Sequence, residues 1–168
     1  MTATGAETEI LKEIEQRGRY FDELETGTRY IHRPGRTATE ADNVIFTTLT
    51  MNGQPLHLDA AYSATQEFGR PLMNSMWTLS TMVGLSVAQI TLGTLVAQLS
   101  LTDVAFPHPL FAGDTIVVDT VIGEKRQSKT RPGQGIVTMT HTARNQEGVI
   151  VAMATRTALM LLSDGAPS

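Results

Sequence analysis

The stretch from Pro71 to Thr102 contains no Asp, Glu, Lys or Arg, and it constrains the fold more than any other feature of this chain. Polar uncharged residues and two glycines recur within it, which is not the pattern of a membrane span. Apolar residues in its first part follow helical three-to-four spacing, and a helix that is apolar on nearly every side is normally buried. We therefore expect Ser75 to Thr91 to form a long core helix. The predicted buried stripe contains Met76, Leu79, Val83, Val87 and Ile90, with Met82 and Leu85 beside it.

Strand patterns dominate the sequence after this helix. Alternating or β-branched residues predict strands over 95–102, 115–122, 137–143 and 149–162, with a turn at Arg131-Pro-Gly133. An earlier strand is expected over 29–36, where Pro34 indicates an edge or a bulge. Two helices should follow, one from Thr39 to about Thr50 with a capping box closed by Asp42, and one over 57–68. This order favours an α+β fold in which an antiparallel sheet wraps around a long central helix.

The length of 168 residues suits a single domain with its own core. We expect an N-terminal helical extension over 1–19, because the charged segment from Thr8 to Arg19 has apolar residues at helical spacing. The domain itself should occupy 20–163, and 164–168 should form a flexible tail.

Composition excludes several classes of function. The net charge is −4 and no long basic stripe is present, so we expect no nucleic-acid partner. Cysteine is absent, which excludes disulfides, thiolate catalysis and Cys-ligated zinc. No apolar run follows a basic N-terminus, so we expect a cytoplasmic protein without a membrane partner. The histidines lack metal-ligand spacing with carboxylates, and no metal is predicted.

The strongest candidate for chemistry is His57, in the segment Asn52-Gly-Gln-Pro-Leu-His57 just before the uncharged stretch. An acid/base group at the rim of an apolar pocket suits a reaction on an uncharged carbonyl substrate. A structural alternative exists for both ends of this segment. His57 could simply bind backbone at a helix start, and Asn52 could be part of an ordinary helix-terminating turn.

Other polar residues admit two interpretations. Arg126, Lys129 and Arg131 form a basic cluster at a predicted hairpin, which is either a solvated turn or a contact for phosphates or a carboxylate. His141 alternates with apolar residues and is interpreted as a core or interface residue, whereas His32 and His108 are expected at the surface or in loops. Core packing is predicted for Met73, Met76, Trp77 and Met82.

Several segments together resemble the MaoC-type dehydratases, which are (R)-specific enoyl-CoA hydratases with the hot-dog fold. The resemblance covers about residues 20 to 162 and rests on Thr39-Glu-Ala-Asp42, the run TLTMNGQPLHLD at 48–59, Phe68-Gly69 and Asn74-Ser-Met76. Residues 125–135 resemble more narrowly the branch that handles mesaconyl-CoA, methylmalyl-CoA or itaconyl-CoA.

The resemblance assigns roles to the segment around His57. The catalytic loop of that family reads Gly-Asp-x-Asn-Pro-x-His, so His57 matches the histidine, Pro55 the proline and Gln54 the asparagine. Asn52 stands where the family has aspartate. A carboxylate can take a proton from water, whereas a neutral amide can only orient it. Either His57 transfers the protons alone and Asn52 holds the water, or the chain lacks this activity. Asp59 could substitute, although in the family pattern it starts a helix.

The resemblance also implies how the thioester is polarised. Asn74-Ser75-Met76 matches a family His-Gly-Met, so the Ser75 N–H at the start of the core helix would stabilise the enolate. Asn52, His57 and Ser75 are therefore the predicted catalytic residues. The predicted substrate contacts are Gln54, Pro55, Asn74, Met76, Arg126, Lys129 and Arg131.

The resulting expectation is a hydratase or dehydratase of a short enoyl-CoA, with branched and dicarboxylic acyl groups among the candidates. No cofactor is expected beyond the coenzyme A that the substrate carries. The resemblance implies a homodimer or a higher homo-oligomer. Two alternatives stay open: a non-catalytic acyl-CoA-binding or partner subunit, and a thioesterase. The thioesterase is disfavoured because it needs a carboxylate near the core helix, and Pro71 to Thr102 has none.

Overall fold

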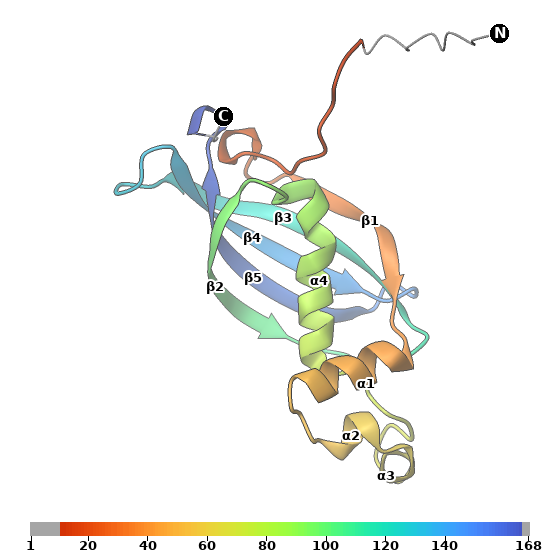
Figure 1. Cartoon of the computed structure of the whole chain (residues 1–168). Coiled ribbons are helices and arrows are strands. Elements are labelled where there is room, and N and C mark those ends of the chain that lie inside the picture. Colours follow the sequence, from red (N-terminus) through yellow and green to blue (C-terminus); the bar gives the residue numbers. More distant parts are fainter. Residues whose placement is uncertain (1–10, 166–168) are drawn as a thin grey trace, which may run out of the picture.

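The computed structural model describes residues 11–165, in which one antiparallel sheet curves around one long helix (Figure 1). The long helix is α4 (Ser75–Ile90), and the sheet has the order β1-β3-β4-β5-β2. Its strands are β1 (Arg29–Thr37), β2 (Leu95–Ala105), β3 (Thr115–Gln127), β4 (Gln134–Arg144) and β5 (Ile150–Leu161). The predicted α+β architecture is confirmed. Among the described residues, no helix is long and apolar enough to cross a membrane.

Three short helices lie at the N-terminal end of α4, at the bottom of Figure 1: α1 (Glu40–Leu49), α2 (Pro55–Leu58) and α3 (Ala60–Ala64). The predicted capping box of α1 is confirmed, because Thr39 Oγ1 accepts from the Asp42 N–H at 3.1 Å and Asp42 Oδ2 accepts from the Thr39 N–H at 2.9 Å. The single helix predicted over 57–68 is wrong. Asp59 separates α2 from α3, since its carboxylate accepts the Tyr62 N–H at 2.9 Å and so begins a new helix.

The two ends of the described chain differ from the predicted extension and tail. Leu11 to Tyr20 form no helix, while residues 8–10 of the predicted helix lie outside the described range. Leu11 and Ile14 are 90% and 82% exposed, so their stripe buries nothing, and an isolated helix of this length is marginal in water. At the other end, the short 3-10 helix η2 (Ser163–Gly165) includes the first two residues of the expected tail. Residues 166–168 lie outside the described range.

The buried face of α4 is not the predicted stripe. Met76 is 47% exposed, and Val83 and Val87 are only half-buried. The face that meets the sheet combines apolar and small polar residues, namely Trp77, Thr78, Met82, Ser86 and Ile90. Met73, Trp77 and Met82 are core residues as predicted, whereas the same prediction for Met76 is wrong.

A polar layer explains this mixed face, because it divides the core beneath α4 into two apolar clusters. Met82 and Ile116 belong to the cluster nearer the α4 N-terminus, and Ile90 and Ile122 to the other. One buried polar residue separates the clusters on each of four elements: Ser86 on α4, Thr120 on β3, His141 on β4 and Arg156 on β5. Ser86 lies on the inner face of α4 because the sheet beneath it is polar at that level.

Candidate functional site

The side chain of His57 is anchored to the backbone of a later segment. Pro55 occupies the first turn of α2, where its missing N–H costs nothing, and His57 follows on the same short helix. His57 Nδ1 lies 2.9 Å from the Leu72 carbonyl oxygen. A carbonyl can only accept, so Nδ1 carries the hydrogen and the neutral ring keeps a lone pair at Nε2. The half-buried imidazole is therefore set up to accept a proton at Nε2.

His57 lines a cavity of about 310 Å³ between α1, α2 and the loop that follows β2. Two charged residues, Glu40 and Arg70, share this lining with Asn43 and Phe111. The Arg70 guanidinium lies 3.7 Å from the centre of the Phe111 ring, a distance that favours a cation–π contact. The cavity thus combines a histidine base, a carboxylate and a cation held against an aromatic wall.

Asn52 is bound within its own turn. Its backbone N–H donates to the Thr47 carbonyl at 3.0 Å, and its Oδ1 accepts the Gln54 N–H at 3.1 Å. This is the geometry of the helix-terminating turn that the structural alternative predicts. Within residues 11–165 no hydrogen bond joins Asn52 to His57, and Nδ2 is the amide atom left for another partner. Gln54 is exposed beside it.

The first turn of α4 presents a free backbone donor. Asn74 is the buried N-cap, and its Oδ1 accepts the Met76 N–H at 2.9 Å. The Ser75 N–H has no acceptor in the described part of the chain, so this donor is open to a ligand. Ser75 lines a second cavity, of about 240 Å³, together with Leu72 and His108. His57 and Ser75 therefore line two separate cavities.

Asn43 and Arg70 are site residues that the sequence interpretation missed. Asn43 lies on the inner face of α1, where its amide bonds the backbone of His57, Leu72 and Asn74. A signal for it existed, because Asn43 and Thr47 are polar residues one turn apart on the face of α1 that is buried. Arg70 carries the last charge before the uncharged stretch. It lines the same cavity as His57 because of the path of the loop between them, which no local sequence pattern indicates.

The basic cluster does not lie near His57 in the single chain. Arg126 and Arg131 line two other cavities, and with Lys129 they lie on or between β3 and β4. That hairpin lies at the opposite end of the sheet from α1, α2 and α3 (Figure 1). All three side chains are exposed.

The remaining histidines divide between core and loop. His108 lies in an exposed loop as predicted, and His141 is fully buried in the core as predicted. The expectation for His32 is wrong, since it is 2% exposed and points inward from β1. Its Nδ1 lies 2.9 Å from Gln89 Oε1 and its Nε2 lies 2.7 Å from Thr120 Oγ1. His32 therefore extends the polar layer to β1.

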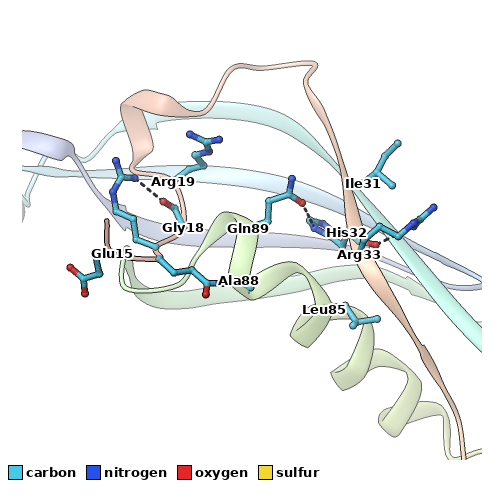
Figure 2. A pocket seen from close by; sticks show the side chains of 11 residues that line it. Glu15, Gly18, Arg19, Ile31, His32, Arg33, Leu85, Ala88 and Gln89 are labelled. Atoms are coloured by element: carbon cyan, nitrogen blue, oxygen red, sulfur yellow. Dashed lines mark hydrogen bonds between the residues drawn. The ribbon is translucent and has the colours of Figure 1, made fainter. Parts of the chain in front are cut away.

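A further cavity, of about 610 Å³, lies beside the outer end of this layer (Figure 2). The segment before β1, β1 itself and the C-terminal half of α4 line it, and Figure 2 shows His32 and Gln89 pointing toward one another there. Arg17 is engaged by Glu23 at 2.6 Å, so it is not a free cation. Among residues 11–165 no group of three potential metal ligands is present.

Comparisons with known proteins place the chain in a family. The family model described as MaoC like domain matches residues 22–145. The chain is 31% identical over 111 residues to a protein named (R)-specific enoyl-CoA hydratase from Aeromonas caviae, covering 66% of this chain and 77% of that protein. It is 24% identical over 134 residues to one named Mesaconyl-CoA hydratase from Haloarcula marismortui, covering 79% of this chain and 37% of that protein. The chain spans only 29% and 37% of the length of two curated relatives.

A solved structure gives the same fold. The Mycobacterium tuberculosis protein Rv0216, described as having a double hot-dog fold, matches with a TM-score of 0.80 over 92% of this chain and 48% of that chain. The sequence identity is 23%, so this likeness concerns the fold alone. The predicted hot-dog fold is confirmed.

Proposed function

Because the chain belongs to the family of MaoC-like domains, we propose that it is a hydro-lyase that adds or removes water at the double bond of an enoyl-CoA thioester. One observation carries this proposal. The Leu72 carbonyl holds the Nδ1 hydrogen of His57, which leaves Nε2 as a base at a cavity of about 310 Å³. The names of the relatives from Aeromonas caviae and Haloarcula marismortui support the same reaction class.

The chemistry needs one water and one base. His57 Nε2 takes a proton from the water as its oxygen attacks the β-carbon, and the electron pair of the double bond moves to form the thioester enolate. The protonated imidazole then returns the proton to the α-carbon. No electron leaves the substrate, so no redox cofactor is required, and coenzyme A enters only as part of the substrate.

Asn52 and Ser75 have complementary roles in this proposal. Asn52 Oδ1 already accepts the Gln54 N–H, and Nδ2 has no partner among the described residues, so Nδ2 donates to the water oxygen and holds it for His57. The unpaired Ser75 N–H, at the positive end of α4, stabilises the enolate oxygen. Gln54, Pro55, Asn74 and Met76 shape the surroundings of these groups. The thioester must then pass from the cavity of His57 to that of Ser75.

For the acyl group we propose a short chain, branched or dicarboxylic. Arg70 supports the dicarboxylic case, because it is the arginine that shares a cavity with His57 and a guanidinium can bind a carboxylate with two hydrogen bonds. Contact of Arg126, Lys129 and Arg131 with coenzyme A phosphates requires a second copy of the chain. The homo-oligomer and the cytoplasmic location stay predictions.

Incubation with crotonyl-CoA, mesaconyl-CoA and itaconyl-CoA tests the reaction through the loss of enoyl absorbance. We expect hydration of at least one substrate, and a rate at least ~10²-fold lower in His57→Ala, which removes the base. Gln66→Ala, an exposed change in the same region, is the control for folding and should keep the wild-type rate. Tight binding without turnover would instead indicate the non-catalytic subunit, and release of free coenzyme A would indicate a thioesterase.

The same substrates test the acyl specificity. Arg70→Gln should raise KM for the two dicarboxylic substrates about 10-fold or more and leave KM for crotonyl-CoA within about threefold, since one charge-assisted bidentate contact is lost. Arg126→Gln is the matched comparison. If Arg126→Gln raises KM selectively for the dicarboxylic substrates and Arg70→Gln does not, the free carboxylate of the acyl group binds the basic cluster of Arg126, Lys129 and Arg131.

A further inference from the structure

Asn43 uses its whole side-chain amide to hold the backbone around the proposed site. Its Nδ2 donates to the carbonyl oxygens of His57 at 3.0 Å and Leu72 at 2.9 Å, and its Oδ1 accepts the Asn74 N–H at 2.8 Å. The residue is 4% exposed. Asparagine is a poor residue for a helix interior, so its place on α1 is explained by these three contacts rather than by helix formation.

The Leu72 carbonyl couples Asn43 to the imidazole. Its oxygen accepts from Asn43 Nδ2 at 2.9 Å and from His57 Nδ1 at 2.9 Å, so both of its lone pairs are used. Asn43 thereby fixes the direction in which this oxygen faces His57. An oxygen held in that direction keeps the hydrogen on Nδ1 and the lone pair on Nε2.

The third contact reaches the start of α4. Asn74 precedes Ser75, whose free N–H is the proposed enolate donor, and the Asn74 N–H is held by Asn43 Oδ1 at 2.8 Å. His57 and Asn74 are therefore both hydrogen-bonded to Asn43, which lies on α1. This amide therefore links the segment that carries the base to the segment that carries the backbone donor, alongside the hydrogen bond from the Leu72 N–H to the Leu56 carbonyl.

We propose that Asn43 is a positioning residue that sets the tautomer of His57 and the placement of the α4 N-terminus relative to it. The inference rests on the proposed hydratase function for its effect on rate. Its effect on the imidazole is independent of any reaction. In this role Asn43 transfers no proton and acts through Leu72 and Asn74.

Asn43→Asp is the sharpest variant, because it is isosteric and keeps an oxygen for the Asn74 N–H while losing both Nδ2 donors. Nitrogen-15 NMR of histidine-labelled full-length protein reads the tautomer directly. We expect wild-type His57 to be protonated at Nδ1 and the variant to show a mixture or the Nε2 form. The kcat for hydration should fall ~10- to 100-fold while KM stays within about threefold, as expected when a base is misplaced by a small distance.

The matched control is Thr47→Val. Thr47 lies one turn further along the same face of α1, is fully buried and accepts from Asn74 Nδ2 at 3.2 Å, but among residues 11–165 its side chain makes no hydrogen bond to His57 or Leu72. This variant should keep the Nδ1 form of His57. A loss of that form in both variants would mean that α1 packing sets the tautomer, and it would overturn the role of Asn43.

Two outcomes separate this inference from the proposed function. If no enoyl-CoA is hydrated but the tautomer changes in Asn43→Asp, the hydratase proposal fails and the positioning role stands. If hydration occurs and Asn43→Asp retains both kcat and the Nδ1 form, the positioning role is overturned while the function stands. Should Asn43→Asp not fold, the wild-type spectrum still decides, because an Nε2-protonated His57 in the native protein contradicts the inference.

Discussion

At the scale of single residues, the proposed mechanism depends on how Asn52 can hydrogen-bond. The family pattern places an aspartate at this position, whereas here Oδ1 already accepts the Gln54 N–H at 3.1 Å, and Nδ2 has no partner among the described residues. The wholly unpaired atom is then a donor, Nδ2. A donor can hold water through its oxygen, which leaves the hydrogen of that water directed at a separate base. The substitution of Asn for Asp therefore suits a site in which His57 alone transfers protons.

Replacing this amide by a carboxylate tests the assignment. In Asn52→Asp the turn is retained, because Oδ1 can still accept the Gln54 N–H, but the donor to water is lost. We expect about a 10-fold fall in kcat at an unchanged thermal midpoint, within the usual contribution of one positioned polar group. Steady-state rates with the best enoyl-CoA provide the measurement. A faster rate would show that a carboxylate acting as a second base is the better arrangement, and an equal rate would remove the Nδ2 donor from the mechanism.

At the scale of elements, the first turn of α4 is where the proposed mechanism uses the backbone as a functional group. Asn74 caps the helix through the Met76 N–H and leaves the Ser75 N–H unpaired among the described residues. Asn74 has φ −61° and ψ 124°, which is compatible with a following proline. Proline is also favourable at the first helical position. The donor can therefore be removed without breaking the helix.

Comparing two variants isolates the backbone N–H of Ser75. Ser75→Ala removes the hydroxyl and keeps the N–H, so its kcat should stay within about threefold of wild type. Ser75→Pro removes the N–H, and kcat should fall ~10²- to 10³-fold, the usual effect of losing one such donor. Circular dichroism checks that α4 persists in both. Equal rates in the two variants would remove Ser75 from the mechanism.

The polar layer across the sheet has a definite direction of hydrogen bonding. His32 Nδ1 donates to Gln89 Oε1, and Thr120 donates to His32 Nε2 while accepting from His141 Nδ1 at 2.7 Å. His141 Nε2 is then an unprotonated atom with no partner among the described residues. Burial, together with the nearby Arg156 guanidinium, lowers the pKa of His141 to about 3. Burial also lowers the pKa of His32.

These pKa shifts predict that the protein loses stability on acidification at pH values well above those at which carboxylates become protonated. The unfolded chain protonates His141 below pH 6.5, whereas the native chain keeps it neutral down to about pH 3, so the free energy of unfolding should fall as the pH drops through this range. Each pH unit costs about 1 kcal/mol for His141, and the lowered pKa of His32 acts in the same direction. Urea unfolding at pH 6.5 and 5 should show this slope, reduced but not abolished in His141→Gln because His32 remains.

Glu23 affects stability in a different pH range from the two histidines. The hydrogen bond from Arg17 lowers the pKa of Glu23 to about 2, so its contribution is present above pH 4.5 and is lost only below it. His108→Gln, a change in an exposed loop, should keep the wild-type slope between pH 6.5 and 5. A slope unaltered by His141→Gln would show that His141 is not neutral in the native core.

At the scale of the whole molecule, the two edges of the sheet are treated differently. The edge strand β1 carries Pro34, a register shift between His32 and Arg36, and three arginines, all of which discourage pairing with another strand. The edge strand β2 carries Asp103 as its only charged residue and exposes Val96, Leu99 and Val104. An exposed apolar edge of this kind favours association, so the predicted dimer should form through β2.

A charge on this edge tests the prediction. Leu99 is 50% exposed, so Leu99→Lys should fold normally while disfavouring contact between two β2 strands. Light scattering after size-exclusion chromatography should show a dimer for the wild type and a monomer for the variant. Ile31→Lys on β1, at 57% exposure, is the matched control and should stay dimeric. A monomeric wild type, or dissociation by the β1 change alone, contradicts the assignment.

Much of the fold was predictable because its signals are local. The absence of charge from Pro71 to Thr102 and the helical spacing within it were enough to identify α4. Alternation identified β2 and β4, and β-branched residues and turn signals identified β3 and β5. The capping box of Thr39 and Asp42 and the position of His57 after Pro55 also depend on neighbours a few residues apart. Backbone hydrogen bonds and side-chain periodicity act over these distances, so the sequence by itself determined the elements and the candidate base.

Only the tertiary structure decided which faces and which distant residues meet. The polar layer on the sheet selected Ser86 rather than Val83 for the inner face of α4, and it turned His32 inward. Asn43 reaches the backbone of Leu72, 29 residues later in the chain, through packing of α1 against the α4 N-terminus. Such contacts depend on the positions of whole elements, and no local pattern encodes those positions. The candidate base is therefore evident in the sequence, whereas the amide proposed to orient it appears only in the fold.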